Sequence, residues 1–219
     1  MDPLRFAIAA TPLAAYLILL GLVNLRRHPL LVTGGGDLAA LGVALSGVAF
    51  VGPISLFRPE DATAELGNYV WLFLLAFYWL WLTLIVMVCR PRLVIYNLTA
   101  EELRPVLSQA ARQVDATCRW AGEGLSLPAR GVNVHIDSFS WMRNTSLVAS
   151  GGTQDLAGWA RLTKTVERSL RNVESRPNRL GPTMLVAGGG LLGTAILRMA
   201  ADPPAVAIAL RQLFAFGDA

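Results

Sequence analysis

Residues 69–88 of this chain read YVWLFLLAFYWLWLTLIVMV. The stretch has no charge, no proline and no glycine, and it contains three of the chain's six tryptophans. A helix of about 20 apolar residues is long enough to cross the hydrocarbon core of a bilayer, which is roughly 30 Å thick. Inside such a helix every backbone polar group is satisfied within the segment. The stretch is therefore predicted to be a transmembrane helix.

The composition of the whole chain agrees with a membrane protein. Of its 219 residues, 54% are hydrophobic and 16% are charged, which is far from the average of soluble domains. The net charge is +4, but the basic residues are spread along the sequence, so no nucleic-acid partner is expected. The two cysteines, Cys89 and Cys118, are too few for a disulfide framework, which favours a reducing compartment.

The same length criterion predicts four membrane spans, at about residues 3–23, 37–57, 68–89 and 183–199. The first three spans make residues 1–89 a transmembrane region, and Asp37 is expected to cap the N-terminus of the second span. Residues 181–219 contain the fourth span and a shorter apolar piece at about 205–216. Because about 12 residues cannot cross a bilayer, this last piece is predicted to be an interfacial helix.

The orientation of the spans follows from the arginines in the connections, because basic residues are retained on the cytoplasmic side. The first connection carries Arg26 and Arg27, whereas the connection at 58–65 carries one arginine and three acidic residues. Arginines also flank both ends of residues 90–180. The predicted location is a bacterial-type inner membrane, with the N-terminus outside and residues 90–180 in the cytoplasm.

Residues 90–180 have the pattern of a small α+β domain. Residues 93–96 predict a buried strand, and Thr99 with Glu102 forms the signature of a capping box, which begins a helix ending near 114. Further strands are predicted at 117–120, 125–127, 132–136 and 145–150, and a final amphipathic helix begins at Asp155. The order is β-α-β-β-(β)-α. We expect an antiparallel sheet covered on one face by both helices, since each element has one apolar side to bury.

The predicted spans contain few groups that could carry chemistry. Their uncharged hydroxyl side chains include Ser46, Ser55, Thr83, Thr183 and Thr194, and none of these relays a proton. The sequence contains no G-x-S-x-G, no H-E-x-x-H and no pair of cysteines at metal-ligand spacing. No catalytic residue, metal ligand or cofactor is therefore predicted.

One candidate ligand face lies on the clearest predicted strand. Asn133, His135 and Asp137 alternate with apolar residues, so their side chains project from the same side of the strand. A carboxylate beside an imidazole can orient it, and such a face could bind a small ligand. The ordinary alternative is that these side chains form the solvated side of the sheet.

The third span has aromatic side chains on two faces of the helix. One stripe contains Phe73, Phe77, Trp81 and Leu84, and the nearly opposite stripe contains Trp71, Tyr78 and Leu82. Trp79 and Trp81 lie near the middle of the span, away from the water boundary that tryptophan usually prefers. Phe73, Phe77, Tyr78, Trp79 and Trp81 are therefore candidates for packing against another helix, an ordered lipid or a flat hydrophobic molecule. The alternative is contact with bulk lipid or with the chain's own helices.

The fourth span contains a pair of glycines four residues apart, Gly189 and Gly193. Small residues at this spacing let two helices approach closely. The pair is predicted to pack against a helix, with the choice between this chain and a partner left open.

Packing surfaces without catalytic groups favour a non-enzymatic membrane subunit. The expected protein is a structural or accessory component of a larger membrane complex, with a cytoplasmic interaction domain. Its expected partners are bilayer lipid and either another membrane protein or further copies of this chain. Two alternatives stay open: a membrane-anchored sensor or enzyme that binds a small ligand on the cytoplasmic domain, and a component of a transporter.

Overall fold

The computed structural model describes residues 2–54, 69–139, 142–151 and 154–214. The chain divides into two compact units, each assembled from segments far apart in sequence. We call the first the helical unit; it comprises Met1–Leu20, Leu38–Val88 and Thr183–Ala219. The second, the sheet unit, comprises Gly21–Asp37 and Cys89–Pro182.

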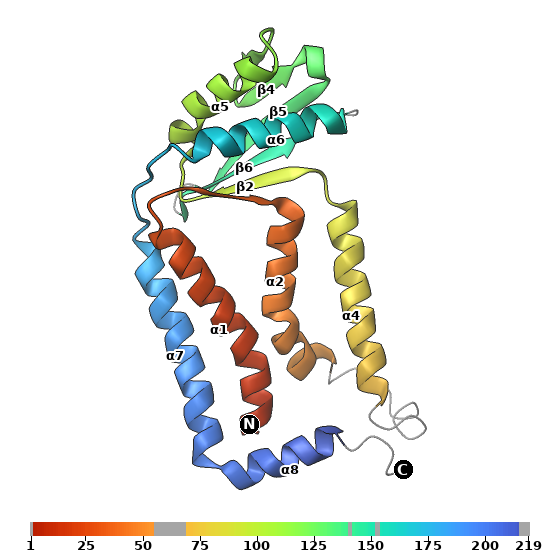
Figure 1. Ribbon diagram of the computed structural model, residues 1–219. Coiled ribbons are helices and arrows are strands. Elements are labelled where there is room, and N and C mark those ends of the chain that lie inside the picture. Colours follow the sequence, from red (N-terminus) through yellow and green to blue (C-terminus); the bar gives the residue numbers. More distant parts are fainter. Residues whose placement is uncertain (1, 55–68, 140–141, 152–153, 215–219) are drawn as a thin grey trace. The chain divides into compact units, whose positions relative to one another are not determined.

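Four helices are long and apolar enough to cross a membrane, as the sequence predicts. They are α1 (Pro3–Leu25), α2 (Gly34–Ala49), α4 (Tyr69–Val88) and α7 (Leu180–Ala201) (Figure 1). A π-helical turn, η1 (Phe50–Ile54), continues α2 at its C-terminal end. The predicted residues 55–57 and Asn68 lie outside the described part of the chain, as does the connection at 58–65.

Small residues allow the helices of the helical unit to approach one another. A Cβ atom added at Gly47 of α2 would collide with the backbone carbonyl of Ile8 in α1. A Cβ atom at the buried Gly188 of α7 would lie 2.9 Å from the carbonyl oxygen of Ala14 in α1. Without a hydrophobic effect between helices in lipid, such close approach is what stabilises their packing.

The start of α2 differs from the prediction. The helix begins at Gly34, and the Thr33 hydroxyl accepts a hydrogen bond from the Gly36 amide at 3.2 Å, so Thr33 and not Asp37 caps it. The Asp37 carboxylate instead accepts a hydrogen bond from the Tyr96 hydroxyl and lies 3.4 Å from the Arg92 guanidinium. The predicted cap was wrong because three glycines wind into the first turn ahead of the aspartate.

The sheet unit contains a six-stranded antiparallel sheet with strand order β1-β2-β6-β5-β4-β3. The strands are β1 (Leu30–Thr33), β2 (Arg92–Tyr96), β3 (Arg119–Ala121), β4 (Gly124–Leu127), β5 (Val132–Phe139) and β6 (Asn144–Ala149). The predicted antiparallel pairing is confirmed, but four strands, β3 to β6, lie between the two helices of residues 90–180, where the predicted order β-α-β-β-(β)-α has two or three. The sequence analysis missed β1, which comes from the first connection and pairs with β2, placing Val32 opposite Val94.

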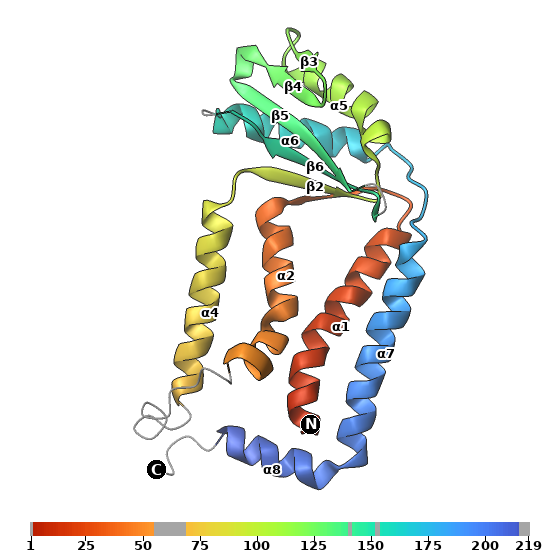
Figure 2. The ribbon, with the colours of Figure 1, turned by 180° about the vertical axis from the view of Figure 1, so that it is seen from behind.

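Two helices, α5 (Ala100–Val114) and α6 (Leu156–Leu170), lie on the same face of this sheet (Figure 2). Their buried leucines and valines share one core with the inward-facing strand residues, among them Ile95, Val134 and Leu147. The predicted capping box is present: Thr99 accepts from the Glu102 amide, and the Glu102 carboxylate accepts from the Thr99 amide. Asp155 caps α6 through the amides of the first turn.

The chain ends its described part with α8 (Pro203–Phe214). The Asp202 carboxylate accepts a hydrogen bond from the Ala205 amide at 3.1 Å and so caps this helix. A helix is thus present where the sequence predicts one at 205–216, although residues 215 and 216 lie outside the described residues.

Candidate functional site

Two short segments of the sheet unit, 24–27 and 175–178, are joined by backbone hydrogen bonds. The Ser175 amide donates to the Arg27 carbonyl at 2.7 Å, and the Asn178 amide donates to the Asn24 carbonyl at 2.9 Å. The two bonds share one antiparallel register. The first segment begins with the last two residues of α1, and the second leads into α7. Residues about 150 positions apart in the chain are therefore held side by side.

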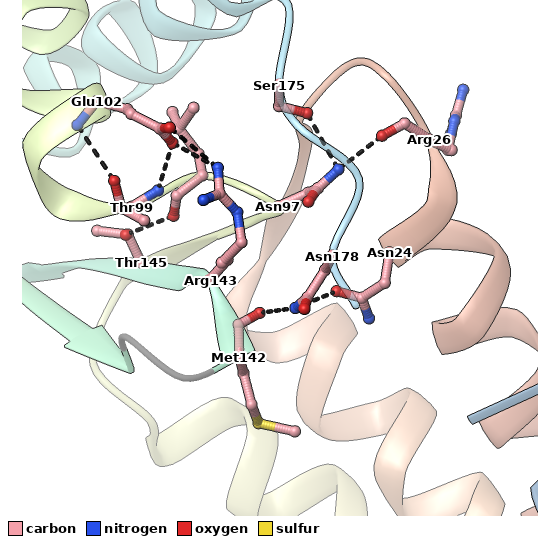
Figure 3. A network of polar contacts seen from close by, with 11 residues as sticks. Asn24, Arg26, Asn97, Thr99, Glu102, Met142, Arg143, Thr145, Ser175 and Asn178 are labelled. Carbon is pink, nitrogen blue, oxygen red and sulfur yellow. Dashed lines mark hydrogen bonds and ion pairs between the residues drawn. The ribbon is translucent and has the colours of Figure 1, made fainter. Parts of the chain in front are cut away.

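Asn97 connects this pair of segments to the sheet. Its side-chain amide donates to the Arg26 carbonyl at 2.6 Å and to the Ser175 hydroxyl at 3.0 Å (Figure 3). The residue is completely buried, directly follows β2, and has a φ of 65°. Asparagine adopts this left-handed conformation more readily than most residues, because its short side chain forms local hydrogen bonds. The turn after β2 and the position of the amide therefore depend on the same residue.

Asn178 makes the second set of contacts. Its side-chain amide nitrogen lies 3.3 Å from the Asn24 side-chain oxygen and donates to the Met142 carbonyl at 2.8 Å (Figure 3). Its side-chain oxygen accepts from the Leu180 amide at 3.1 Å, at the first residue of α7. Asn178 thus ties three segments together and satisfies one of the free amides at the start of α7.

An ion pair and a hydroxyl hold the connection between β5 and β6 against α5. The Arg143 guanidinium donates to both carboxylate oxygens of Glu102, at 2.8 and 3.0 Å. The Arg143 carbonyl accepts from the Leu98 amide, and the Thr145 hydroxyl donates to the Leu98 carbonyl. Burial opposes ionisation of Glu102, but the Thr99 amide and the Arg143 guanidinium outweigh it and hold the pKa below its ordinary value of 4.5.

These contacts form what we call the asparagine network, drawn in Figure 3: Asn24, Arg26, Asn97, Met142, Arg143, Ser175 and Asn178. Within the described residues, three buried polar atoms in and beside it have no hydrogen-bond partner: Asn97 Oδ1, Arg143 Nε and Asn144 Oδ1. Arg143 also has a positive φ of 52°. The side-chain amides of asparagine form hydrogen bonds but do not titrate. The network is therefore suited to hold the segments that it connects in place.

The predicted ligand face is solvated. His135 and Asp137 are both exposed, and the His135 imidazole lies 3.9 Å from the Glu123 carboxylate at the turn before β4. Asn133 stands opposite Ser126 of β4 and lines a hollow of about 250 Å³ with Ser126 and Ser150. His135 and Asp137 do not line that hollow.

The outer side of the helix pair in the sheet unit has a larger groove, of about 500 Å³. Its walls are Val106, Gln109 and Gln113 of α5 and Arg168, Ser169 and Asn172 at the end of α6. The sequence analysis did not identify this groove, because it requires knowing how the two helices pack.

The two aromatic stripes of α4 have different environments. On one side the Tyr78 hydroxyl donates to the Gly42 carbonyl at 2.6 Å, and a Cβ atom at Gly42 would collide with Leu82. The Trp71 ring lies 6.0 Å from the Phe50 ring. On the other side the exposed fractions are 65% for Phe73, 66% for Phe77 and 59% for Trp81. One stripe packs against α2 and its π-helical turn, and the other is left uncovered by the described residues.

Trp79 lies between these two stripes. It is 39% exposed, and its ring meets the ring of Tyr78 edge-on, with centroids 5.8 Å apart. The backbone carbonyl of Trp79 accepts a hydrogen bond from the Thr83 hydroxyl. Of the five aromatic candidates, Tyr78 packs within the chain, Trp79 is at the border, and Phe73, Phe77 and Trp81 face outward.

The glycines of α7 also divide into two sets. Gly188 is buried against Ala14 and Ile18 of α1. Added Cβ atoms at Gly189 and Gly193 would meet no atom of the described chain within 4 Å. The close helix contact therefore uses Gly188, which the sequence analysis did not select, while Gly189 and Gly193 face open space.

Among the residues that the structure describes, no group of three or more His, Cys, Asp or Glu side chains could hold a metal ion. No protein-family model, curated protein or solved structure matches this chain. The described part of the chain thus has four apolar helices that are compatible, by length and composition, with a multi-pass membrane protein, and a separate antiparallel sheet.

Proposed function

We propose that this chain is a non-enzymatic, multi-pass membrane subunit and a structural or accessory component of a larger membrane complex. In this proposal the helical unit contacts partner helices, and the sheet unit is a cytoplasmic domain that docks a partner. The single observation that carries it is the uncovered aromatic stripe of Phe73, Phe77 and Trp81, opposite a stripe that already packs within the chain.

A large aromatic ring is stabilised more when it packs against specific side chains than when it makes no specific contact. Each large ring buries about 150–250 Å² in an interface, and offset or edge-on pairs of rings add further stabilisation. Three such rings at a spacing of four residues lie on one side of α4. A stripe of this kind fits a protein helix better than fluid lipid, because rigid rings pack best against a fixed surface.

The distribution of charge supports a cytoplasmic sheet unit. The sheet unit contains 15 Lys and Arg, and the helical unit contains 4. Seven of the 15 lie within ten residues of a membrane-length helix: Arg26, Arg27, Arg90, Arg92, Arg171, Arg176 and Arg179. Basic segments beside spans are retained in the cytoplasm. In the proposed orientation, the sheet unit therefore lies on the cytoplasmic side of an inner membrane and the N-terminus lies on the outer side.

The groove between α5 and α6 supports a docking role for the sheet unit. Its walls offer the amides of Gln109, Gln113 and Asn172 together with the Arg168 guanidinium. These groups pair with backbone carbonyls or carboxylates of a bound segment. The proposed partner of the groove is therefore a polar peptide segment.

Purification in mild detergent at native expression tests the proposal. We expect a second chain, or further copies of this one, to co-purify with the wild type. The variant F73L/F77L/W81L keeps the helix apolar but removes the rings, and it should lose the partner. A control, L19A/L22A, truncates exposed leucines of α1 and should keep it. A wild type that runs as a lone monomer would contradict the proposal.

A second candidate function is a small-ligand sensor at the hollow lined by Ser126, Asn133 and Ser150. Three small polar side chains at the edge of a hollow provide both donors and acceptors for a ligand. The variants N133A and H135A distinguish the pocket from the neighbouring strand face. Loss of a ligand response in N133A with an unchanged H135A would favour the pocket.

A further inference from the structure

Four arginines occupy the paired segments 24–27 and 175–178 and the position next to them: Arg26, Arg27, Arg176 and Arg179. All four are exposed, whereas Asn24, Ser175 and Asn178 of the same segments are buried. The buried side chains anchor the backbone, so the arginines extend from a fixed base. We call this group the arginine patch.

The register of the two segments places residues of like charge at corresponding positions. Since the Ser175 amide donates to the Arg27 carbonyl and the Asn178 amide donates to the Asn24 carbonyl, Arg26 corresponds to Arg176. Positive charges concentrated on two neighbouring segments repel each other. The pairing is nevertheless held by two backbone hydrogen bonds and by the Asn97 amide. An arrangement of this kind is stabilised by an anion that lies between the charges.

The described residues of this chain do not supply that anion. Arginines elsewhere in the sheet unit pair with carboxylates: Arg92 with Asp37, Arg143 with Glu102, and Arg171 with Glu167. None of the ion pairs found among the described residues involves a member of the arginine patch. Unlike Arg92, Arg143 and Arg171, the four arginines of the patch therefore have their charge available to a partner.

The position of the patch in the chain indicates the kind of partner. Arg26 follows directly after Leu25, the last residue of α1, and Arg179 directly precedes Leu180, the first residue of α7. If α1 and α7 cross the bilayer, these residues lie at the level of the lipid headgroups. Basic clusters immediately beside spans attract anionic lipid, and each basic residue near the surface contributes about 1 kcal/mol.

We propose that the arginine patch is a binding site for the headgroup of an anionic phospholipid. The inference rests on the proposed membrane insertion of α1 and α7. The asparagine network holds the two segments together and so fixes the backbone of the patch. The arginines therefore form a defined site that binds individual lipid molecules, in addition to their role in setting the orientation of the chain in the membrane. The recognised group is the lipid phosphate, which guanidinium groups bind through paired hydrogen bonds.

Native mass spectrometry of the full chain in detergent, with added phosphatidylglycerol or phosphatidylcholine, tests this site. We expect the wild type to retain phosphatidylglycerol selectively. The variant R26Q/R27Q/R176Q/R179Q should bind it at least about tenfold more weakly. The control R112Q/R119Q/R161Q/K164Q removes the same charge from exposed basic residues elsewhere in the sheet unit and should bind within about twofold of the wild type. Equal losses in both variants would overturn the proposal.

Three further measurements cover the other outcomes. Excess inorganic phosphate should not displace the lipid, and displacement would show a site for a free anion instead. If the glutamine variant does not fold, the wild type is titrated with salt instead. Its selectivity for phosphatidylglycerol over phosphatidylcholine should weaken as the salt concentration rises, and selectivity that does not weaken would overturn the proposal. Membrane insertion is checked separately by alkaline carbonate extraction: release of the chain would refute the proposed function, whereas loss of selectivity in a chain that stays in the membrane refutes the lipid site alone.

Discussion

The side-chain amide of Asn97 donates a hydrogen bond to the backbone carbonyl of Arg26, 2.6 Å away and 71 positions earlier in the chain. This contact ties the turn after β2 to the residue that follows α1. The same amide reaches the Ser175 hydroxyl, on the segment that leads into α7. One buried residue therefore joins three parts of the sheet unit, and its substitution should have a larger effect than that of any exposed asparagine.

Replacing Asn97 with alanine should destabilise the chain by about 2–4 kcal/mol, because two hydrogen bonds are lost and alanine must adopt a positive φ. The variant N97G also loses the amide but accommodates the φ, so it should be about 1 kcal/mol more stable than N97A. Thermal unfolding in detergent measures both. Equal stability of the two variants would show that backbone conformation contributes little at this position.

Gly188 and Gly189 provide a matched pair on α7. The variant G188V places a branched side chain against Ala14 and Ile18 of α1 and should cost about 1–3 kcal/mol, because the helices must separate. The variant G189V enters open space and should leave the stability of the isolated chain within about 0.5 kcal/mol of the wild type. Thermal unfolding again decides. A larger loss in G189V than in G188V would contradict the described α1 and α7 contact.

The hydroxyl of Tyr78 gives a test of how α4 packs on α2. The variant Y78F removes the hydrogen bond to the Gly42 carbonyl and should cost about 1 kcal/mol. The neighbouring variant F77L lies on the uncovered stripe and should leave the unfolding temperature of the isolated chain unchanged. If Y78F is neutral while F77L destabilises, the assignment of the two stripes is reversed.

Acid should weaken the sheet unit through Glu102. Since the folded state lowers the pKa of this carboxyl, its stabilising contribution is complete above the ordinary value of 4.5 and is lost as the pH falls through the lower folded value. The unfolding temperature of the wild type should therefore decline below pH 4.5, and E102Q should show a smaller decline. Circular dichroism melts across this range measure it, with E101Q as the exposed control.

Asp115 adds to the same acid sensitivity. The hydroxyl and amide of Thr117, together with the Ala129 amide, lower the pKa of its carboxyl. Its contribution is lost as the pH falls below its ordinary value of 3.8, so it affects stability at lower pH than Glu102 does. An E102Q chain should therefore retain a decline in this more acidic range, and the variant D115N should remove part of it.

Much of the sheet unit was predictable because the signals are local. The capping box at Thr99 and the alternation in β5 are patterns within a few residues, and both elements are present. β1 was missed because its four residues lie between two apolar stretches and carry no alternation of their own. Its strand character comes from pairing with β2, a contact between residues more than 60 positions apart.

The candidate site was less predictable. Asn24, Asn97 and Asn178 each stand at the end of a helix or strand, and polar residues at such boundaries were a usable signal. The predicted residues Asn133, His135 and Asp137 alternate on one strand, and of these three only Asn133 lines the hollow beside Ser126 and Ser150. Alternation identifies a face of a strand, whereas it does not show which other segment meets that face.

The sequence alone determined which segments are membrane-length helices and that strands lie between two helices in residues 90–180, but not that these strands number four. Helix length, hydropathy and residue period are properties of neighbouring residues, so they can be read without knowing the fold. Only the tertiary structure decided that Tyr78 packs while Phe77 is uncovered, that Gly188 and not Gly189 meets α1, and that segments 24–27 and 175–178 pair. Each of these contacts depends on which distant segment lies within contact distance. When a helix is apolar on all sides, its own sequence does not indicate which face packs against that segment.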